Sequence, residues 1–93
     1  MPVKRYTVDG NKIRTLDDFY DRISHRMNLS DHFGRNLDAL WDVLAFDIEG
    51  SFEIKWMHAD KSRKSMGEDF DRVVKLLREL EEERDDFHLN IEP

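Results

Sequence analysis

Three short strand-like segments are separated by stretches with helical periodicity, and this order leaves the chain few possible folds. The segments are residues 4–8 (KRYTV), 51–56 (SFEIKW) and 87–92 (FHLNIE). Strands joined by helical crossovers usually pair in parallel through right-handed connections, so we expect a three-stranded parallel sheet. The second and third segments alternate between apolar and polar residues, whereas strands covered on both faces are apolar throughout. The predicted fold class is therefore a two-layer α/β domain with its helices mainly on one side of the sheet.

Helical spacing of apolar residues fills most of the chain between these strands. A capping box at Thr15 begins a helix that runs to about Met27. Residues 58–65 (HADKSRKS) are polar and are expected to form a loop. A second capping box at residues 65–68 begins a long helix, which ends within the acidic run EEERDD at residues 81–86. We expect that run to be a solvated helix end and turn.

Composition indicates a single domain over residues 1–93. The chain is 39% hydrophobic and has six Phe, two Trp and two Tyr, which is enough for one core without covalent staples. It has no cysteine, which excludes disulfides and thiolate metal sites. The sequence contains neither a membrane-length apolar run nor a secretory signal pattern. We therefore expect a cytoplasmic protein.

Acidic residues outnumber basic residues, and this balance bears on the choice of partner. Fifteen Lys and Arg against twenty-one Asp and Glu give a formal net charge of -6. Such a charge disfavours direct binding to nucleic acid or to anionic membranes and favours basic partners. Solubility alone is the alternative explanation of a mildly acidic surface.

Two aspartates in the segment HFGRNLDALWDVL stand out. The segment predicts a helix from a cap near Asn36 to about Leu44, and Asp38 and Asp42 lie four residues apart on one face of it. Such like charges repel by roughly 0.2–0.5 kcal/mol. Asp38 lies in the first turn, where the helix dipole favours a carboxylate and Arg35 is within pairing distance along the helix. Asp42 has no basic residue at three or four positions on either side, so either a solvated surface role or a binding role remains open.

A second acidic pair, Glu79 and Glu83, lies four residues apart on the long helix. Here the helix itself offers partners, because Lys75 is spaced to pair with Glu79 and Arg78 with Glu82. In a domain of this size the two acidic faces could still converge into one negative patch.

Catalysis has little support in the sequence. The four histidines, His25, His32, His58 and His88, lack metal-ligand spacing, and neither a glycine-rich phosphate loop nor an HExxH or GxSxG motif is present. We expect no enzyme activity, metal ion or cofactor. A carboxylate-dependent enzyme built on Asp38 or Asp42 is the remaining catalytic alternative.

The segment FGRNLDALWDVL resembles the signature segment of the barstar family, whose members inhibit the ribonuclease barnase. The resemblance covers nearly the whole chain, with DGNKIRTLDDFYDRI before the motif and SFEIKW and VVKLLRELEEE after it. It implies a three-stranded parallel sheet with helices and a function as a tight protein inhibitor.

The resemblance also implies a set of functional residues. Asp38 and Asp42 match the aspartates of the family's binding helix, and Asp42 would enter a ribonuclease active site in place of a substrate phosphate. The expected partner-binding residues are Asp38, Asp42, Trp41, Asn36, His32, Phe46, Glu79 and Glu83. The chain departs from the family pattern at His32, which replaces a tyrosine, at Phe46, which replaces a glycine, and at Asp47, which replaces a tryptophan. Val43 and Asp85 occupy the positions of two cysteines.

The leading expectation is a barstar-like ribonuclease inhibitor or immunity protein that is monomeric when free. Its partner would be a basic ribonuclease or a nuclease-like toxin. The alternative function is that of a non-catalytic acidic interaction module or toxin-immunity module for another basic protein.

Overall fold

A computed structural model describes residues 3–93 and contains one parallel sheet. The strand order is β1-β2-β3, and the register places Tyr6 beside Ile54 and Ile54 beside Leu89. The three strands are β1 (Lys4–Asp9), β2 (Phe52–Met57) and β3 (Phe87–Ile91). The predicted parallel sheet is confirmed, and the predicted strand ends differ from the observed ones by no more than a residue.

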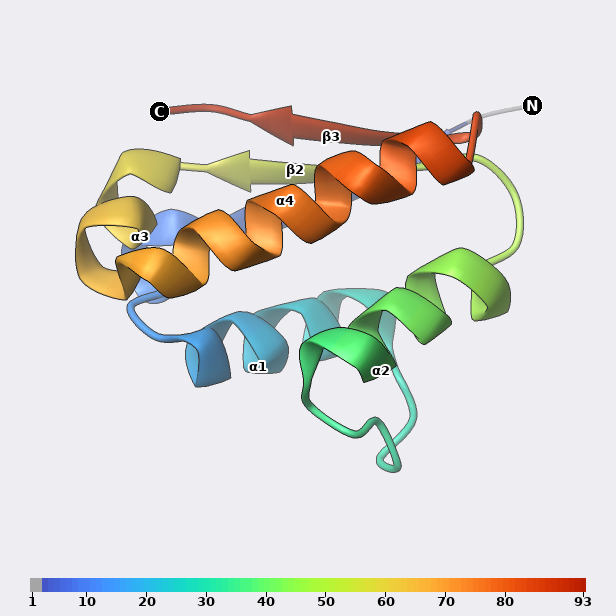
Figure 1. The fold of residues 1–93 in the computed structure, drawn as a ribbon, viewed down its shortest axis with the longest axis horizontal. Helices are drawn as coiled ribbons and strands as arrows, with labels where there is room; N and C mark the ends of the chain where they lie inside the picture. The colour runs from blue at the N-terminus through green and yellow to red at the C-terminus, as the bar shows by residue number, and fades with distance from the viewer. Residues whose placement is uncertain (1–2) are drawn as a thin grey trace.

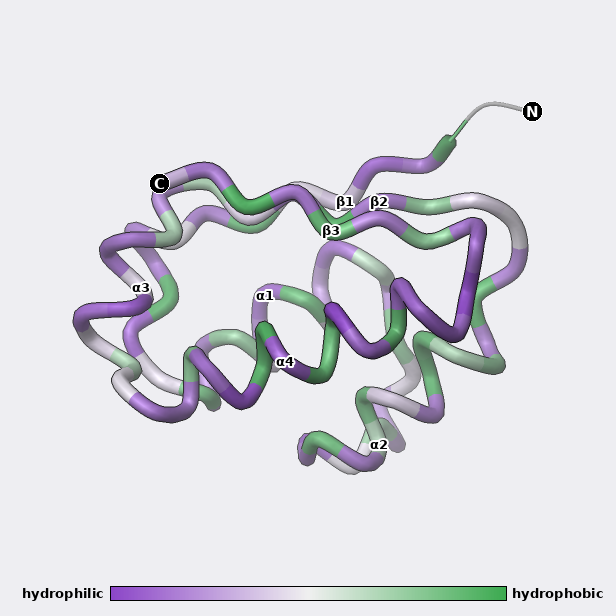
Figure 2. The backbone as a smooth tube through the Cα atoms, turned by 45° about the horizontal axis from the view of Figure 1, so that its top comes forward, coloured by the Kyte–Doolittle hydropathy of each residue, from purple (hydrophilic) through white to green (hydrophobic). Residues whose placement is uncertain are grey.

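The sheet has one face packed against helices. In Figure 1, α1 and α2 lie below the strands, and in the turned view of Figure 2 α4 lies below them as well. On β2 the alternate residues Phe52, Ile54 and Trp56 are buried in the core, while Glu53 and Lys55 are partly exposed. The same alternation of apolar and polar residues is visible along the strands in Figure 2. The predicted two-layer arrangement is therefore confirmed.

Five helical segments, with α2 and η2 counted as one, connect the strands, and their bounds can be compared with the predicted ones. The predicted ends of α1 are confirmed, whereas the second helix extends beyond Leu44 as a π-helical turn. The segments are η1 (Gly10–Lys12), α1 (Leu16–Met27), α2 (Leu37–Asp42) with its continuation η2 (Val43–Asp47), α3 (Ala59–Met66) and α4 (Glu68–Glu83).

Two predicted helix caps are present. The Thr15 hydroxyl accepts a hydrogen bond from the backbone N–H of Asp18 at 3.0 Å. The Asn36 carboxamide oxygen accepts one from the backbone N–H of Ala39 at 2.7 Å. Each satisfies a backbone donor that the first turn of a helix leaves free, which contributes about 1 kcal/mol.

The predicted loop over residues 58–65 is wrong, because α3 occupies this segment. Ala59, Ser62 and Met66 form its buried face, and the spacing was hidden because only Met66 is strongly apolar. The buried Ser62 hydroxyl accepts a hydrogen bond from the indole N–H of Trp56 at 3.2 Å and donates one to the carbonyl oxygen of Gly10 at 3.0 Å. The predicted cap at residue 65 is also wrong, since α4 begins after Gly67.

The acidic run at residues 81–86 is more than a solvated helix end, which corrects the expectation. The Glu81 carboxylate is partly buried, pairs with Arg78 at 2.9 Å and accepts a hydrogen bond from the backbone N–H of Leu89 at 2.9 Å. Burial acts to raise the pKa of Glu81, but the Leu89 N–H and the Arg78 guanidinium outweigh it and lower that pKa below its ordinary value. Glu81 thus ties the end of α4 to β3.

Across residues 3–93 the helices are too short or too polar to cross a membrane.

Candidate functional site

The helix that carries the two aspartates is held firmly on its buried side. Leu40 of α2 and Leu44 of η2 are fully buried in the core, and each stabilises the fold by about 1.5–3 kcal/mol relative to an exposed position. Asn36 uses its other amide atom as well, donating to the carbonyl oxygen of Gly34 at 3.2 Å. The loop and the first turn of α2 are therefore fixed relative to each other.

Asp38 and Asp42 are exposed on this helix, and the structure leaves both carboxylates without an ion pair within residues 3–93. The predicted pairing of Arg35 with Asp38 is wrong. Arg35 precedes the helix with a φ of 51°, and its guanidinium pairs with Asp17 and Asp21 of α1 instead. Because residues 36–54 contain no lysine or arginine, this segment supplies no cation of its own.

The second acidic pair lies on α4, which packs against both α2 and η2. Glu79 and Glu83 are exposed. The predicted pairing of Arg78 with Glu82 is wrong, because Arg78 pairs with Glu81 and donates to the carbonyl oxygen of Leu89 at 3.2 Å. The part of the chain covered by the structure shows no ion pair between Lys75 and Glu79 either. The packing thus brings together two helices whose exposed acidic pairs make no ion pair within the described residues.

The other expected contact residues lie around α2 and differ in exposure. Trp41 is partly buried and packs against the core, and His32 is exposed in the loop that precedes the helix. Asn36 is exposed, but both of its side-chain polar atoms bind the backbone. Phe46 on η2 is 76% exposed, although exposure of an apolar ring to water is unfavourable. Phe46 and Val3 are the two large hydrophobic residues that are exposed within the described chain.

Arg84 is a positioning residue that sequence reasoning missed. Its guanidinium makes five hydrogen bonds and thereby uses all five of its N–H donors. Nη1 donates to the carbonyl oxygens of Leu44 and Ile48, both at 2.8 Å, and the remaining donors bind Gly50 and the Asp86 carboxylate. The end of η2 and the loop that follows are therefore held to the end of α4.

The contact between Arg84 and Asp86 shifts the pKa of both groups. The hydrogen bond with Asp86 raises the pKa of the Arg84 guanidinium and lowers the pKa of the Asp86 carboxyl.

The one sign of Arg84's role in the sequence was its position as a single basic residue inside the acidic run at residues 81–86. Its carbonyl partners are 34 to 40 residues away in sequence, so the pattern of neighbouring residues could not reveal them.

The exposed residues of α2 and η2 are mainly acidic. Within the described chain, no three His, Asp or Glu side chains gather in a way that could hold a metal ion. The described surface around α2 instead presents carboxylates on a fixed helix beside an exposed aromatic ring.

Comparison with known proteins agrees with this picture. The model of the family described as "Barstar (barnase inhibitor)" matches residues 3–92. A Bacillus subtilis (strain 168) protein named "Putative ribonuclease inhibitor YrdF" is 28% identical over 91 residues, which span 97% of this chain and the whole of that relative. Because the family model matches nearly every residue and the fold is the one expected, this chain belongs to the barstar family.

Proposed function

We propose that this protein inhibits a ribonuclease by placing the α2 carboxylates in the enzyme's basic active site. The observation that carries the proposal is the state of Asp42, which is exposed on a capped helix with no ion pair in the described chain. Membership of the barstar family and the name of the Bacillus subtilis relative support the same function.

The physical requirements of the target explain the arrangement. A ribonuclease must hold a phosphate among basic side chains, so its cleft has a positive potential. The Asp42 carboxylate takes the position of that phosphate and satisfies cations that docking removes from water. The inhibitor needs only to occupy the cleft, so we infer neither catalysis nor a cofactor.

The acids around Asp42 have a separate role in this proposal. Asp38 on the docking helix and Glu79 and Glu83 on the adjacent α4 add negative charge, which would accelerate the encounter with a basic enzyme and make its rate depend on salt. The formal net charge of -6 acts in the same direction.

Aromatic side chains supply the apolar part of the proposed interface. Phe46 on η2 is 76% exposed in the free protein and would bury its ring on binding, while Trp41 on α2 is partly buried and packs against the core. Exposed aromatic residues beside charged groups are the usual anchors of protein interfaces. Asn36 contributes by holding the start of α2 rather than through free polar atoms.

A second candidate function is binding of a basic protein other than a ribonuclease. It is favoured by His32, Phe46 and Asp47, which stand where the family pattern has tyrosine, glycine and tryptophan. These residues leave the α2 carboxylates in place and alter the surface beside them.

The two functions are separated by one pair of assays. The purified protein is mixed with a basic secreted ribonuclease from the same cell, followed by size-exclusion chromatography and an RNA-cleavage assay. Inhibition predicts a one-to-one complex and loss of cleavage at equimolar protein. If neither a complex nor loss of cleavage is observed, and a pull-down from the same cell recovers only non-nuclease basic proteins, the inhibitor function is wrong and the second candidate stands.

A further inference from the structure

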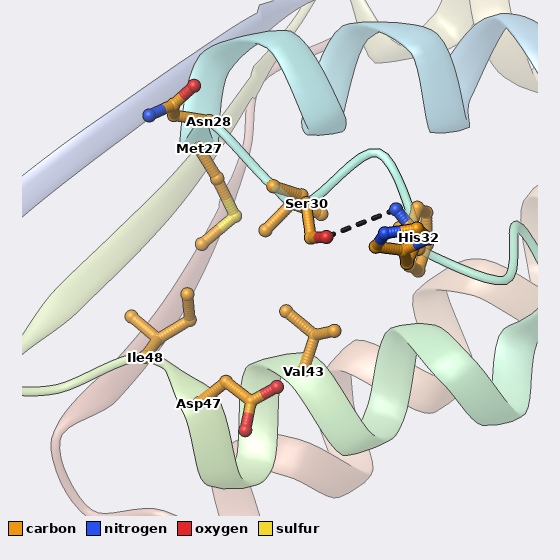
Figure 3. Close-up of a pocket in the computed structure, with 9 residues that line it drawn as sticks. Met27, Asn28, Ser30, His32, Val43, Asp47 and Ile48 are labelled. Atoms are coloured by element: carbon orange, nitrogen blue, oxygen red, sulfur yellow. Dashed lines mark hydrogen bonds between the residues drawn. The ribbon is translucent and has the colours of Figure 1, made fainter.

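A pocket lies beside α2, between the loop that follows α1 and the π-helical η2. Its volume is about 470 Å³. The apolar lining includes Met27, Leu29, Val43 and Ile48. Figure 3 shows Met27, Val43 and Ile48 around the open space, with Asp47 and His32 at its edges. Val43 directly follows Asp42 in sequence, so the pocket adjoins the proposed docking helix.

Both walls of the pocket are fixed by hydrogen bonds in the free protein. On one side α1 ends at Asn28 with a φ of 52°, and the backbone N–H of Leu29 returns to the carbonyl oxygen of Ser24 at 3.0 Å. On the other side Arg84 binds the carbonyl oxygen of Ile48 at 2.8 Å. A cavity with fixed walls binds a guest without the cost of ordering itself.

The chemistry of the pocket combines an apolar lining with negative charge at its mouth. Asp47 is exposed and makes no ion pair within residues 3–93. His32 is the other titratable side chain of the lining, and no lysine or arginine of the described chain lines the pocket. A guest that complements both parts has an apolar stem and a cationic head.

We propose that this pocket receives an arginine side chain of the partner protein. The methylene groups of arginine would lie on Leu29, Val43 and Ile48, and the guanidinium would pair with Asp47. Arginine fits better than lysine because its guanidinium is less strongly hydrated, binds a carboxylate in bidentate fashion and stacks on a ring such as that of His32. The inference rests on the proposed function, and it assigns Asp47 a contact separate from that of Asp42.

An NMR titration tests the proposal without any ribonuclease. The ¹⁵N-labelled protein is titrated with N-acetyl-arginine methylamide and, separately, with N-acetyl-citrulline methylamide, which has nearly the same shape but no charge. We expect saturable shifts at the amides of Leu29, Val43 and Ile48 with the arginine probe and binding about fivefold weaker with the citrulline probe. The substitution Asp47→Asn should weaken arginine binding about fivefold.

The matched control is Asp71→Asn in the first turn of α4, an exposed aspartate that also lacks an ion pair within the described residues. This variant should bind the arginine probe as the parent does. The proposal is overturned if the probe does not bind, if its shifts centre on Asp38 and Asp42, if citrulline binds equally well, or if Asp47→Asn binds as the parent does. Because the enzyme is absent, these outcomes are independent of whether the protein inhibits a ribonuclease.

Discussion

Replacement of Arg84 by leucine should destabilise the fold by about 3–4 kcal/mol. The Arg84 side chain is 14% exposed, and its guanidinium binds the partly buried carbonyl oxygens of Leu44 and Ile48 at 2.8 Å each. A hydrogen bond to a charged donor contributes about 1.5–3 kcal/mol, and the lower value applies to carbonyls that water can partly reach. The Arg84 carbon Cζ also lies 4.9 Å from the centre of the Phe52 ring, which adds roughly 0.5–1 kcal/mol.

Urea unfolding followed by fluorescence of the fully buried Trp56 measures this change. With the slope expected for a small domain, the midpoint should fall by roughly 2 M. The variant Arg84→Lys should lose about half as much stability, because an ammonium group keeps the charge but cannot reach all of the carbonyls together.

The control for Arg84 is Arg72→Leu on α4. Arg72 is 60% exposed and, among residues 3–93, pairs only with Glu68 and Asp69 of its own helix, so its loss should change the free energy of unfolding by less than about 0.5 kcal/mol. If Arg84→Leu and Arg72→Leu destabilise the protein equally, Arg84 does not hold η2 in place.

Three further changes test other parts of the structure. Ser62→Ala leaves the Trp56 indole N–H without its buried partner, whereas the Gly10 carbonyl keeps the backbone N–H of Ile13 at 3.2 Å, and urea unfolding should show a loss of about 1–3 kcal/mol; a loss below about 0.5 kcal/mol would contradict this contact. Because the pKa of Glu81 is lower in the folded protein than in the unfolded chain, its stabilisation is present above the ordinary glutamate pKa and is lost as pH falls through the folded value. Acid titration should therefore reduce the stability of the parent more steeply than that of Glu81→Gln, and parallel curves would refute the assignment. Phe46→Ser should change stability by less than about 0.5 kcal/mol but weaken partner binding by more than about 1 kcal/mol in calorimetry; unchanged binding would remove Phe46 from the interface.

Periodic apolar residues were sufficient to predict the sheet and α1. Phe52, Ile54 and Trp56 alternate along β2, and their burial follows directly from that alternation. The two helix caps could be predicted for the same reason, because the Thr15 and Asn36 side chains each bind a backbone N–H only three residues away. Interactions confined to one turn or one strand can be recognised from neighbouring residues.

The errors arise where distant segments decide the structure. The helix α3 was missed because the buried Ser62 receives its partners from Trp56 and Gly10, neither of which belongs to that helix. Arg35 was expected to pair along its own helix, but its φ of 51° places it before the helix and next to α1. Arg84 could not be recognised because its carbonyl partners lie on another element.

The acidic residues of the candidate site show the same division. Their spacing in sequence predicted which carboxylates share a helix face, and both Asp38 and Asp42 are exposed as that spacing suggested. Asp38 and Asp42 make no ion pair in the described chain. Arg35 pairs with acids of α1 and Arg78 pairs with Glu81, and only the fold determines these partners.

The inhibition constant of the Asp42→Asn variant, measured against a ribonuclease that the parent protein inhibits, tests the proposed mechanism most directly. Asparagine keeps the shape of the side chain and removes its charge, and Asp71→Asn is the matched control on a distant turn. We predict that Asp42→Asn weakens inhibition by about 2–5 kcal/mol, roughly 30-fold or more, while the control inhibits as the parent does. That range comes from charged contacts at protein interfaces in general, the barnase–barstar complex among them. Equal inhibition by Asp42→Asn and the parent would contradict the placement of this carboxylate in the active site.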